Sequence, residues 1–417
     1  MNFRYTAAMP QNTIERYRLY LNLLACATLI FGLFFSRAAL SIGMIVLVSN
    51  SVLHLRFLKI WKQYFRQPEY WLFGLFFLLV AISGFYSENI SEFFMRAKGK
   101  SAFLLLPIAF FIMPSFSLKQ VKGLLLLIFF LCICSAIWSL GLYFQDFESI
   151  TSSYHQAKVI PTPFHHVRFS LVVAFCSLNG FILFAKGSDE YGKYEKWVWL
   201  VGGLFLSVYL HVLAVRSGLA GYYMATITLL VIYIFKQKKY LNGLVGIALI
   251  ACLPVFAFYT VPSFKKKIEY MKYDLEMYSK EYWNKKNYSD SRRLLSIEVA
   301  YRIGMESPVV GHGYGDINLE MKRGYIRYFP NLSEKNYLTP HSQFAFTFVG
   351  LGYIGLLILV MMLLYPVLTS GRWKNPVFLA FNIILFSSFF TEHTLEDQFG
   401  TAIYLFFLLL LMKHPDF

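Results

Sequence analysis

Charged residues are scarce in this sequence: Asp, Glu, Lys and Arg make up only 15% of its 417 residues, whereas 57% are apolar. A soluble protein of this length needs much more polar surface, so the composition predicts an integral membrane protein. The apolar residues form runs of about 17–24, the length that crosses a hydrocarbon core of about 30 Å.

The apolar runs also lack the alternation of polar and apolar residues that is typical of barrel strands. Backbone groups in lipid must be paired within the segment, so the runs are expected to be helices. The predicted fold is all-α, a polytopic membrane helical bundle of about twelve transmembrane helices. The predicted spans lie near 19–35, 38–55, 70–86, 101–114, 121–142, 167–186, 197–215, 217–235, 240–260, 343–366, 376–391 and 398–413.

The sequence has only five cysteines and no apparent cleavable signal peptide. The five cysteines all lie inside apolar runs, which fits small core residues better than disulfides or metal ligands. The first apolar run has no small-residue cleavage site after it, so it is expected to be a retained span and not a signal peptide.

Acidic residues are outnumbered by basic ones, 23 to 39, which gives a formal net charge of +16. Nucleic acid is not the expected partner, because the basic residues lie in short loops between apolar runs. Such loops face the cytoplasm by the positive-inside rule, which also predicts that both termini are cytoplasmic. The residues on which this prediction rests are Arg4, Arg16, Arg18, Arg56, Lys59, Lys62, Arg66, Lys119, Lys122, Lys186, Lys193, Lys196, Lys236, Lys238, Lys239, Arg372, Lys374 and Lys413.

A segment of about eighty residues interrupts the apolar pattern between the ninth and tenth spans. It divides the chain into a first group of spans (1–261), a large outer segment (262–342) and the last three spans (343–417). The stretch SRRLLSIEVAYRIGMES within it predicts a helix, with one apolar face formed by Leu294, Ile297, Tyr301 and Met305. The glycine-rich PVVGHGYGD follows as a turn; it lacks the lysine and the preceding strand of a nucleotide-binding loop.

Arg216 is unusual because apolar sequence surrounds it on both sides, at a nearly absent turn between two spans. A charge near the membrane boundary is costly unless it is paired. An arginine reaching for lipid headgroups is one interpretation, but we favour a functional site. Arg292 and Arg293, at the start of the outer helix, have guanidinium groups that suit phosphate oxygens, or they form a solvated basic face.

His341 precedes the tenth span on the same outer face. Its imidazole is suited to accept a proton from a hydroxyl near neutral pH, although a helix-capping role is the alternative. Glu392, His393 and Glu396 fall on this face too, either as partners of a histidine or arginine or as caps. Further basic groups that could bind a diphosphate there are Arg96, Lys98 and Lys100. Paired carboxylates at a fixed spacing are missing, so no metal is expected to be required.

The ordered set VRSGLAG, SRRLLSIEVAYRIGMESPVVGHGYGD and PHSQFAFTFVGLGYIGLLIL resembles the O-antigen ligase and polymerase superfamily. In that family one arginine opens a helix in an R-S-G-like context, a second precedes a glycine-rich turn, and a histidine begins a later helix. The resemblance covers the C-terminal half; the N-terminal half matches only in hydropathy. Ser342 stands where the family often has Asn, and a one-residue slip leaves Arg292 or Arg293 as the motif arginine.

The resemblance implies a metal-independent, inverting glycosyltransferase without cofactors in the bacterial inner membrane, with a periplasmic site. The donor would be a glycan on undecaprenyl diphosphate, and the acceptor a hydroxyl of lipid A-core or another glycan. Arg216 and Arg293 would bind the diphosphate, and His341 would act as the general base. A polymerase and a protein O-oligosaccharyltransferase of the same superfamily stay open, as does a transporter of lipid-linked substrate. Relatives that glycosylate proteins often carry an extra C-terminal soluble region, so the end of the chain at Phe417 favours ligase or polymerase.

Overall fold

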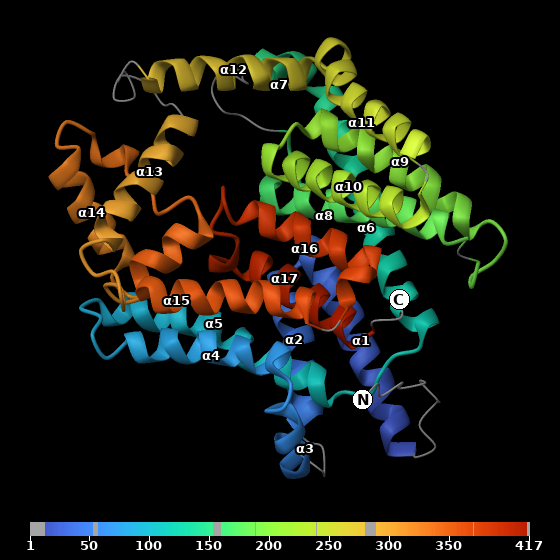
Figure 1. Cartoon of the computed structure of the whole chain (residues 1–417), viewed down its shortest axis with the longest axis horizontal. Coiled ribbons are helices and arrows are strands. Elements are labelled where there is room, and N and C mark those ends of the chain that lie inside the picture. The colour runs from blue at the N-terminus through green and yellow to red at the C-terminus, as the bar shows by residue number, and fades with distance from the viewer. Residues whose placement is uncertain are drawn as a thin grey trace.

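The computed structural model describes residues 13–52, 57–152, 160–187, 189–238, 240–279, 289–369 and 371–414, and these residues form helices and connecting turns without a strand. The all-α prediction is therefore confirmed for this part of the chain (Figure 1). Both chain termini lie outside the described residues.

Each of the twelve predicted spans overlaps one helix. These are α1 (Thr13–Phe35), α2 (Arg37–Val52), α4 (Pro68–Ser83), α5 (Ile90–Ile112), α6 (Leu118–Gln145), α8 (His166–Ala185), α9 (Glu195–Leu213), α10 (Arg216–Gln237), α11 (Tyr240–Thr260), α15 (Gln343–Leu368), α16 (Pro376–Ser388) and α17 (Gln398–Lys413). Seven of the described helices are long and apolar enough to cross a membrane. The total number of spans stays a prediction, because the other helices are shorter or carry charge.

Polar contacts join neighbouring segments at both ends of the bundle. At one end Lys413 donates to the carbonyl of Phe110 (2.7 Å), and Lys122 pairs with Glu195 (3.4 Å). At the other end, the turn after α4 is bonded to the outer segment, since the carboxylate of Asp316 accepts from the backbone N–H groups of Glu88 and Asn89 (both 2.7 Å). The first end is the one that the positive-inside rule assigns to the cytoplasm.

The outer segment contains α12 (Pro262–Ser279), α13 (Ser289–Gly304), α14 (Ile317–Tyr328) and the short helix η3 (Glu334–Asn336). The predicted helix is present as α13, but the predicted apolar face is not its buried face. Leu294, Tyr301 and Met305 are exposed. The residues that α13 buries are Leu295, Val299, Ala300 and Ile303. Apolar residues at spacings of three and four occur on two neighbouring faces of this helix. Only its packing against the rest of the protein shows which of the two faces is buried.

Helix α15 is not the single straight span that the sequence predicts. It is divided at Gly352, whose φ of 60° and ψ of −158° are non-helical. At this kink the glycine-rich turn 308–313 supplies hydrogen bonds: Tyr353 N–H donates to the Pro308 carbonyl (2.7 Å), and Gly313 N–H donates to that of Gly350 (3.0 Å). The two motifs that carry the family resemblance thus hold each other in place. The shorter part of α15, residues 343–351, then presents its N-terminus at the outer end.

Two further short helices complete the structure: α3 (Phe57–Tyr64) after α2, and α7 (Phe147–Ser152) after α6. Three-residue turns of 3₁₀ helix, η4 (Arg372–Lys374) and η5 (Thr394–Glu396), join the last helices.

Candidate functional site

The N-termini of four helices, α8, α10, α15 and α17, meet around the loop 389–397. Gln343 N–H of α15 donates to the carbonyls of Phe389 (2.8 Å) and Glu392 (3.1 Å), so the loop lies directly against this helix start (Figure 1). Ser217 of α10 is hydrogen-bonded to Thr391 of the loop (3.2 Å). The helix dipole, with its positive end at the N-terminus, makes such a region attractive to anions.

Gly218 allows the start of α10 to pack closely against α8. A Cβ at this position would lie 2.5 Å from the Ser170 hydroxyl of α8, so only glycine allows the two helices to approach this closely. The close packing brings the starts of α8 and α10 together. Small residues have this role in many membrane helix pairs.

Glu392 is the carboxylate at the centre of this region, and its side chain is only 2% exposed. One oxygen lies 3.2 Å from the Arg293 guanidinium of α13. The other lies 3.6 Å from Arg168 of α8 and 3.9 Å from Nδ1 of His341. One carboxylate therefore contacts two guanidinium groups and one imidazole, from three separate parts of the chain.

Arg216 lies beside this cluster and is bound by a different acid. Its guanidinium makes a bidentate ion pair with Asp290, the residue three positions before Arg293. Asp290 is held in turn at the start of α13, where its N–H donates to Asp274 (2.7 Å). Because Arg216 is 44% exposed, its outer face is accessible to a ligand. Arg216, Arg293 and His341, which the sequence singled out separately, thus come together at one end of the bundle.

The protonation states follow from burial and from the excess of positive charge. Burial lowers the pKa of His341 to about 3, and the neighbouring Arg293 and His393 act in the same direction. The imidazole is therefore neutral at pH 7 and can accept a proton. Burial raises the pKa of Glu392, although Arg293 and Arg168 oppose this effect.

The two adjacent arginines of α13 point to different partners. Successive helical residues are rotated by about 100°. Arg293 consequently contacts Glu392, whereas the Arg292 guanidinium lies 3.5 Å from the side-chain oxygen of Asn336. The geometry therefore places Arg293, and not Arg292, beside Glu392.

A second cluster forms around Glu396. Its carboxylate accepts from Lys100 (2.8 Å), from the Tyr314 hydroxyl (2.7 Å) and from Gln343 (2.8 Å). Burial alone would raise the pKa of Glu396, but Lys100 and Arg96 outweigh burial and lower it. This carboxylate joins α5, the glycine-rich turn and α15 into one unit.

The basic residues of α5 are therefore not equivalent. Lys100 is fully buried in its pair with Glu396, so it is not available as an exposed diphosphate ligand. Arg96 pairs with Glu92 (2.8 Å) and lies over the Phe346 ring (5.0 Å). Lys98 is exposed on α5, and its carbonyl accepts from Ser101. None of the three has a recorded contact with Glu392 among the described residues.

His393 connects the two clusters. Its ring is stacked on Phe346 (5.8 Å between centroids) and meets the His341 ring edge-on (5.4 Å). Burial lowers its pKa to about 4, with a smaller, opposing effect of Glu396. It supports His341 by packing, as a neutral ring.

Arg168 is a member of the site that the sequence reasoning did not identify. Besides its contact with Glu392, its guanidinium lies 2.8 Å from Asp397 and 3.1 Å from Nδ1 of His165. An arginine at the start of an apolar run was a usable signal, since the same argument singled out Arg216. Lys267 of α12 was also missed. Its pKa is lowered to about 8, mainly by burial and further by repulsion from Arg216.

The arrangement is suited to bind an anion beside a neutral base. Arg168, Arg216 and Arg293 supply guanidinium groups next to helix N-termini, which suits phosphate oxygens. Among the described residues, no group of three or more His, Cys, Asp or Glu side chains is placed to hold a metal ion.

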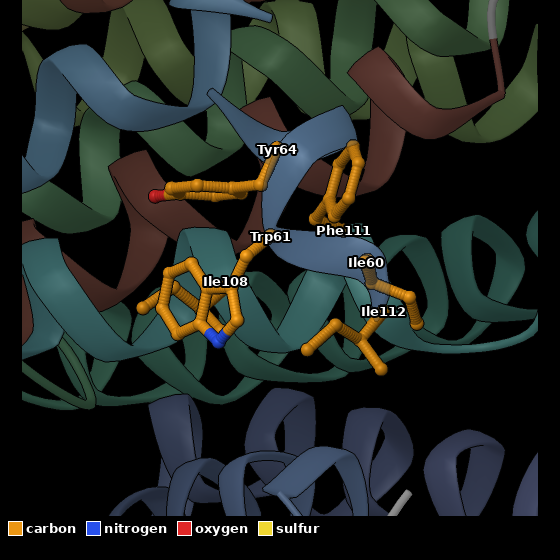
Figure 2. Close-up of a pocket in the computed structure, with 6 residues that line it drawn as sticks. All are labelled: Ile60, Trp61, Tyr64, Ile108, Phe111 and Ile112. Atoms are coloured by element: carbon orange, nitrogen blue, oxygen red, sulfur yellow. The ribbon is translucent and has the colours of Figure 1, made fainter. Parts of the chain in front are cut away.

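An apolar pocket lies away from this region, between α3 and the C-terminal part of α5 (Figure 2). It is lined by Ile60, Trp61, Tyr64, Ile108, Phe111 and Ile112. This lining has neither a cation nor a carboxylate, so it offers no group for diphosphate binding or proton transfer.

Comparison with known proteins agrees with the resemblance read from the motifs. Residues 201–360 match the model of the O-antigen ligase family, a segment that runs from α9 into α15 and includes Arg216, Arg293 and His341. No curated protein matches the chain significantly. The segment of the chain that carries the three motifs is therefore similar to the O-antigen ligase family, as the motifs indicated.

Proposed function

We propose that this chain is an O-antigen ligase: it transfers a glycan from undecaprenyl diphosphate to a hydroxyl of lipid A-core. The reaction would take place at the periplasmic face of the bacterial inner membrane, with both termini cytoplasmic. The observation that carries the proposal is the contact of one buried carboxylate, Glu392, with Arg293 and His341, beside the start of α10 where Arg216 lies.

The diphosphate would bind between Arg216 and Arg293. The exposed side of Arg216 can bind phosphate oxygens while Asp290 holds the guanidinium in position. Arg293 is 30% exposed, so it too can reach a ligand while it contacts Glu392. These fixed positive groups stabilise the negative charge that develops on the departing diphosphate. They perform the role that a metal ion has in other glycosyltransferases.

His341 would accept the proton of the attacking hydroxyl. The hydroxyl oxygen forms a bond to the anomeric carbon of the donor, the bond from that carbon to the diphosphate oxygen breaks, and the proton passes to the imidazole. A single displacement of this kind inverts the anomeric configuration. The negative diphosphate raises the pKa of His341 from its low value in the unliganded protein, and Glu392 stabilises the imidazolium that forms.

The test is complementation of a deletion strain with Arg216→Ala, Arg293→Ala and His341→Ala. Each variant is expected to insert into the membrane and to lose glycan transfer. Arg302→Ala, an exposed arginine on the same helix α13 paired with Glu298, is the matched control and should transfer normally. Normal glycan attachment in one of the three variants contradicts the role of that residue.

The product in the deletion strain distinguishes this proposal from the other activities of the superfamily. Loss of all capped lipid A-core identifies a ligase, a cap of a single repeat identifies a polymerase, and unglycosylated exported proteins identify a protein O-oligosaccharyltransferase. A transporter would move the substrate without release of undecaprenyl diphosphate.

A further inference from the structure

A hollow in the outer segment lies near His341, on the side of Arg292. It is formed between α14 and the segment 334–339, and its volume is about 230 Å³. This is somewhat less than the roughly 300–1,000 Å³ that is typical of sites for drug-sized ligands. The hollow therefore has room for a single sugar unit of a glycan and not for a longer saccharide.

The lining of the hollow combines an aromatic ring with hydrogen-bonding groups. Tyr337 lines it and is stacked on the buried Tyr325, with 4.5 Å between the ring centroids and 8° between the planes. Asn318 and Thr339 contribute an amide and a hydroxyl. At the rim, Lys322 pairs with Glu334 (2.5 Å), which neutralises both charges.

This composition suits a neutral sugar better than a lipid or an anion. A tyrosine ring offers an apolar face to the C–H groups of a pyranose together with a polar hydroxyl. The Asn318 amide already donates to Glu92 (3.0 Å), and Lys322 pairs with Glu334. Sugar hydroxyls can use the hydrogen-bonding capacity that these groups and the Thr339 hydroxyl still have, whereas an apolar chain cannot. A free anion would meet the carboxylate of Glu334.

The hollow is continuous with the candidate active site along the chain. Thr339 lines it, and His341 follows two residues later. Arg292 lies between the hollow and His341, since its guanidinium is near Asn336. Its charge lowers the pKa of His341. The same charge opposes the rise in the pKa of Tyr325 that burial causes. A saccharide in the hollow could therefore present a hydroxyl to the imidazole.

The two arginines at the start of α13 have different partners, because Arg293 contacts Glu392 whereas Arg292 lies near Asn336, beside the hollow. In an in-line displacement the attacking hydroxyl approaches from the side opposite to the leaving diphosphate. If the diphosphate binds at Arg216 and Arg293, the side of Arg292 is left for the acceptor.

We infer that the hollow between α14 and the segment 334–339 binds the acceptor glycan, with Tyr337 as its stacking platform. This inference rests on the proposed function, because it assigns the second substrate of the same reaction.

The experiment measures initial rates with the purified full-length chain in phospholipid vesicles. The lipid-linked donor and the unextended lipid A-core glycolipid are both extracted from the deletion strain, and the concentration of each is varied. Tyr337→Ala removes the platform. Asn318→Trp, at an exposed position of α14, obstructs the hollow without removing a core side chain. The control is Tyr328→Ala, because Tyr328 is on the same helix but bonds to Glu306 (2.7 Å), away from the hollow.

Both hollow variants are expected to raise the KM for the glycolipid about tenfold while kcat stays within about twofold, since the binding energy that is lost is the same in the ground state and the transition state. Tyr328→Ala should leave both constants unchanged. An unchanged KM in the two hollow variants, a fall in kcat alone, or a rise in the KM of the donor instead overturns the inference and leaves the proposed function standing. Absence of transfer by the wild-type chain contradicts the proposed function itself, and the inference with it.

Discussion

Glu392 is the residue whose charge organises the candidate site. Replacing it with glutamine keeps the size of the side chain but removes the carboxylate that faces Arg168, Arg293 and His341. We expect Glu392→Gln to lower the transfer rate about 100-fold, since the imidazolium loses its stabilising charge and Arg293 its fixed position. The rate is measured in membrane vesicles with the lipid-linked donor.

The control for this prediction is Glu306→Gln, on a surface ion pair with Arg327 (2.6 Å) far from the loop 389–397. It should retain the wild-type rate. A Glu392→Gln variant as active as this control would show that the carboxylate has no part in the reaction.

His341 gives the stability of the protein a defined pH dependence. Its pKa is about 3 in the folded chain, below its usual value near 6.5, so acid protonates the unfolded chain first. The contribution of His341 to the free energy of unfolding is thus greatest above about pH 6.5 and falls toward pH 3. At pH 5 this contribution is about 2 kcal/mol smaller than at neutral pH. Thermal unfolding in detergent at pH 7 and pH 5 measures the effect. His341→Asn should lose less stability between pH 7 and pH 5 than the wild-type chain does. An equal loss of stability in both proteins would refute the low pKa of His341.

The sequence identified the individual chemical groups of the site better than their pairing. Arg216 and His341 were recognisable because each is an ionisable residue at the edge of an apolar run. Arg168 has the same signal, yet its partners Glu392 and Asp397 are far away in the chain, so nothing local indicated that it belongs to the site. The choice between Arg292 and Arg293 needed the rotation of α13, which only packing against the loop determines.

At the scale of elements, the division of α15 at Gly352 is the feature that positions His341. The positive φ of Gly352 suits glycine, and a Cβ there would lie 2.4 Å from the Val309 backbone. We expect Gly352→Ala to destabilise the protein by about 3 kcal/mol, through backbone strain and the clash together. It should also lower transfer, because the outer part of α15 and the glycine-rich turn would separate. Thermal unfolding and the transfer rate are measured together.

Gly141→Ala is the matched control, because this glycine lies within helix α6 and its Cβ would meet no atom within 4 Å. Alanine is favoured over glycine in a helix, so stability should stay equal or rise. Equal behaviour of the two variants would show that the kink does not depend on Gly352.

The sequence predicted where the helices are but not how α15 is broken. Apolar residues continue through 343–366 without interruption, so the pattern is that of one span. The break is determined by hydrogen bonds from Tyr353 and Gly313 across to the partner segment, which hydropathy does not record. Likewise, α5 begins at Ile90, well before the predicted span at 101–114, because Glu396 pairs with Lys100 and allows a charged turn to continue into the helix.

At the scale of the whole molecule, the sidedness of the bundle determines whether the site can meet its proposed substrates. The outer segment and the loop 389–397 lie at one end, and the basic loops at the other. Arg327 on α14 and Lys193 before α9 are both exposed, one at each end. In a chain whose native cysteines are replaced by alanine, we expect Arg327→Cys to react with a membrane-impermeant maleimide in intact spheroplasts. Lys193→Cys should react only after the membrane is permeabilised, because basic loops remain in the cytoplasm. The reverse pattern would place Arg216, Arg293 and His341 on the cytoplasmic side, away from a periplasmic acceptor, and the proposed transfer could not take place there.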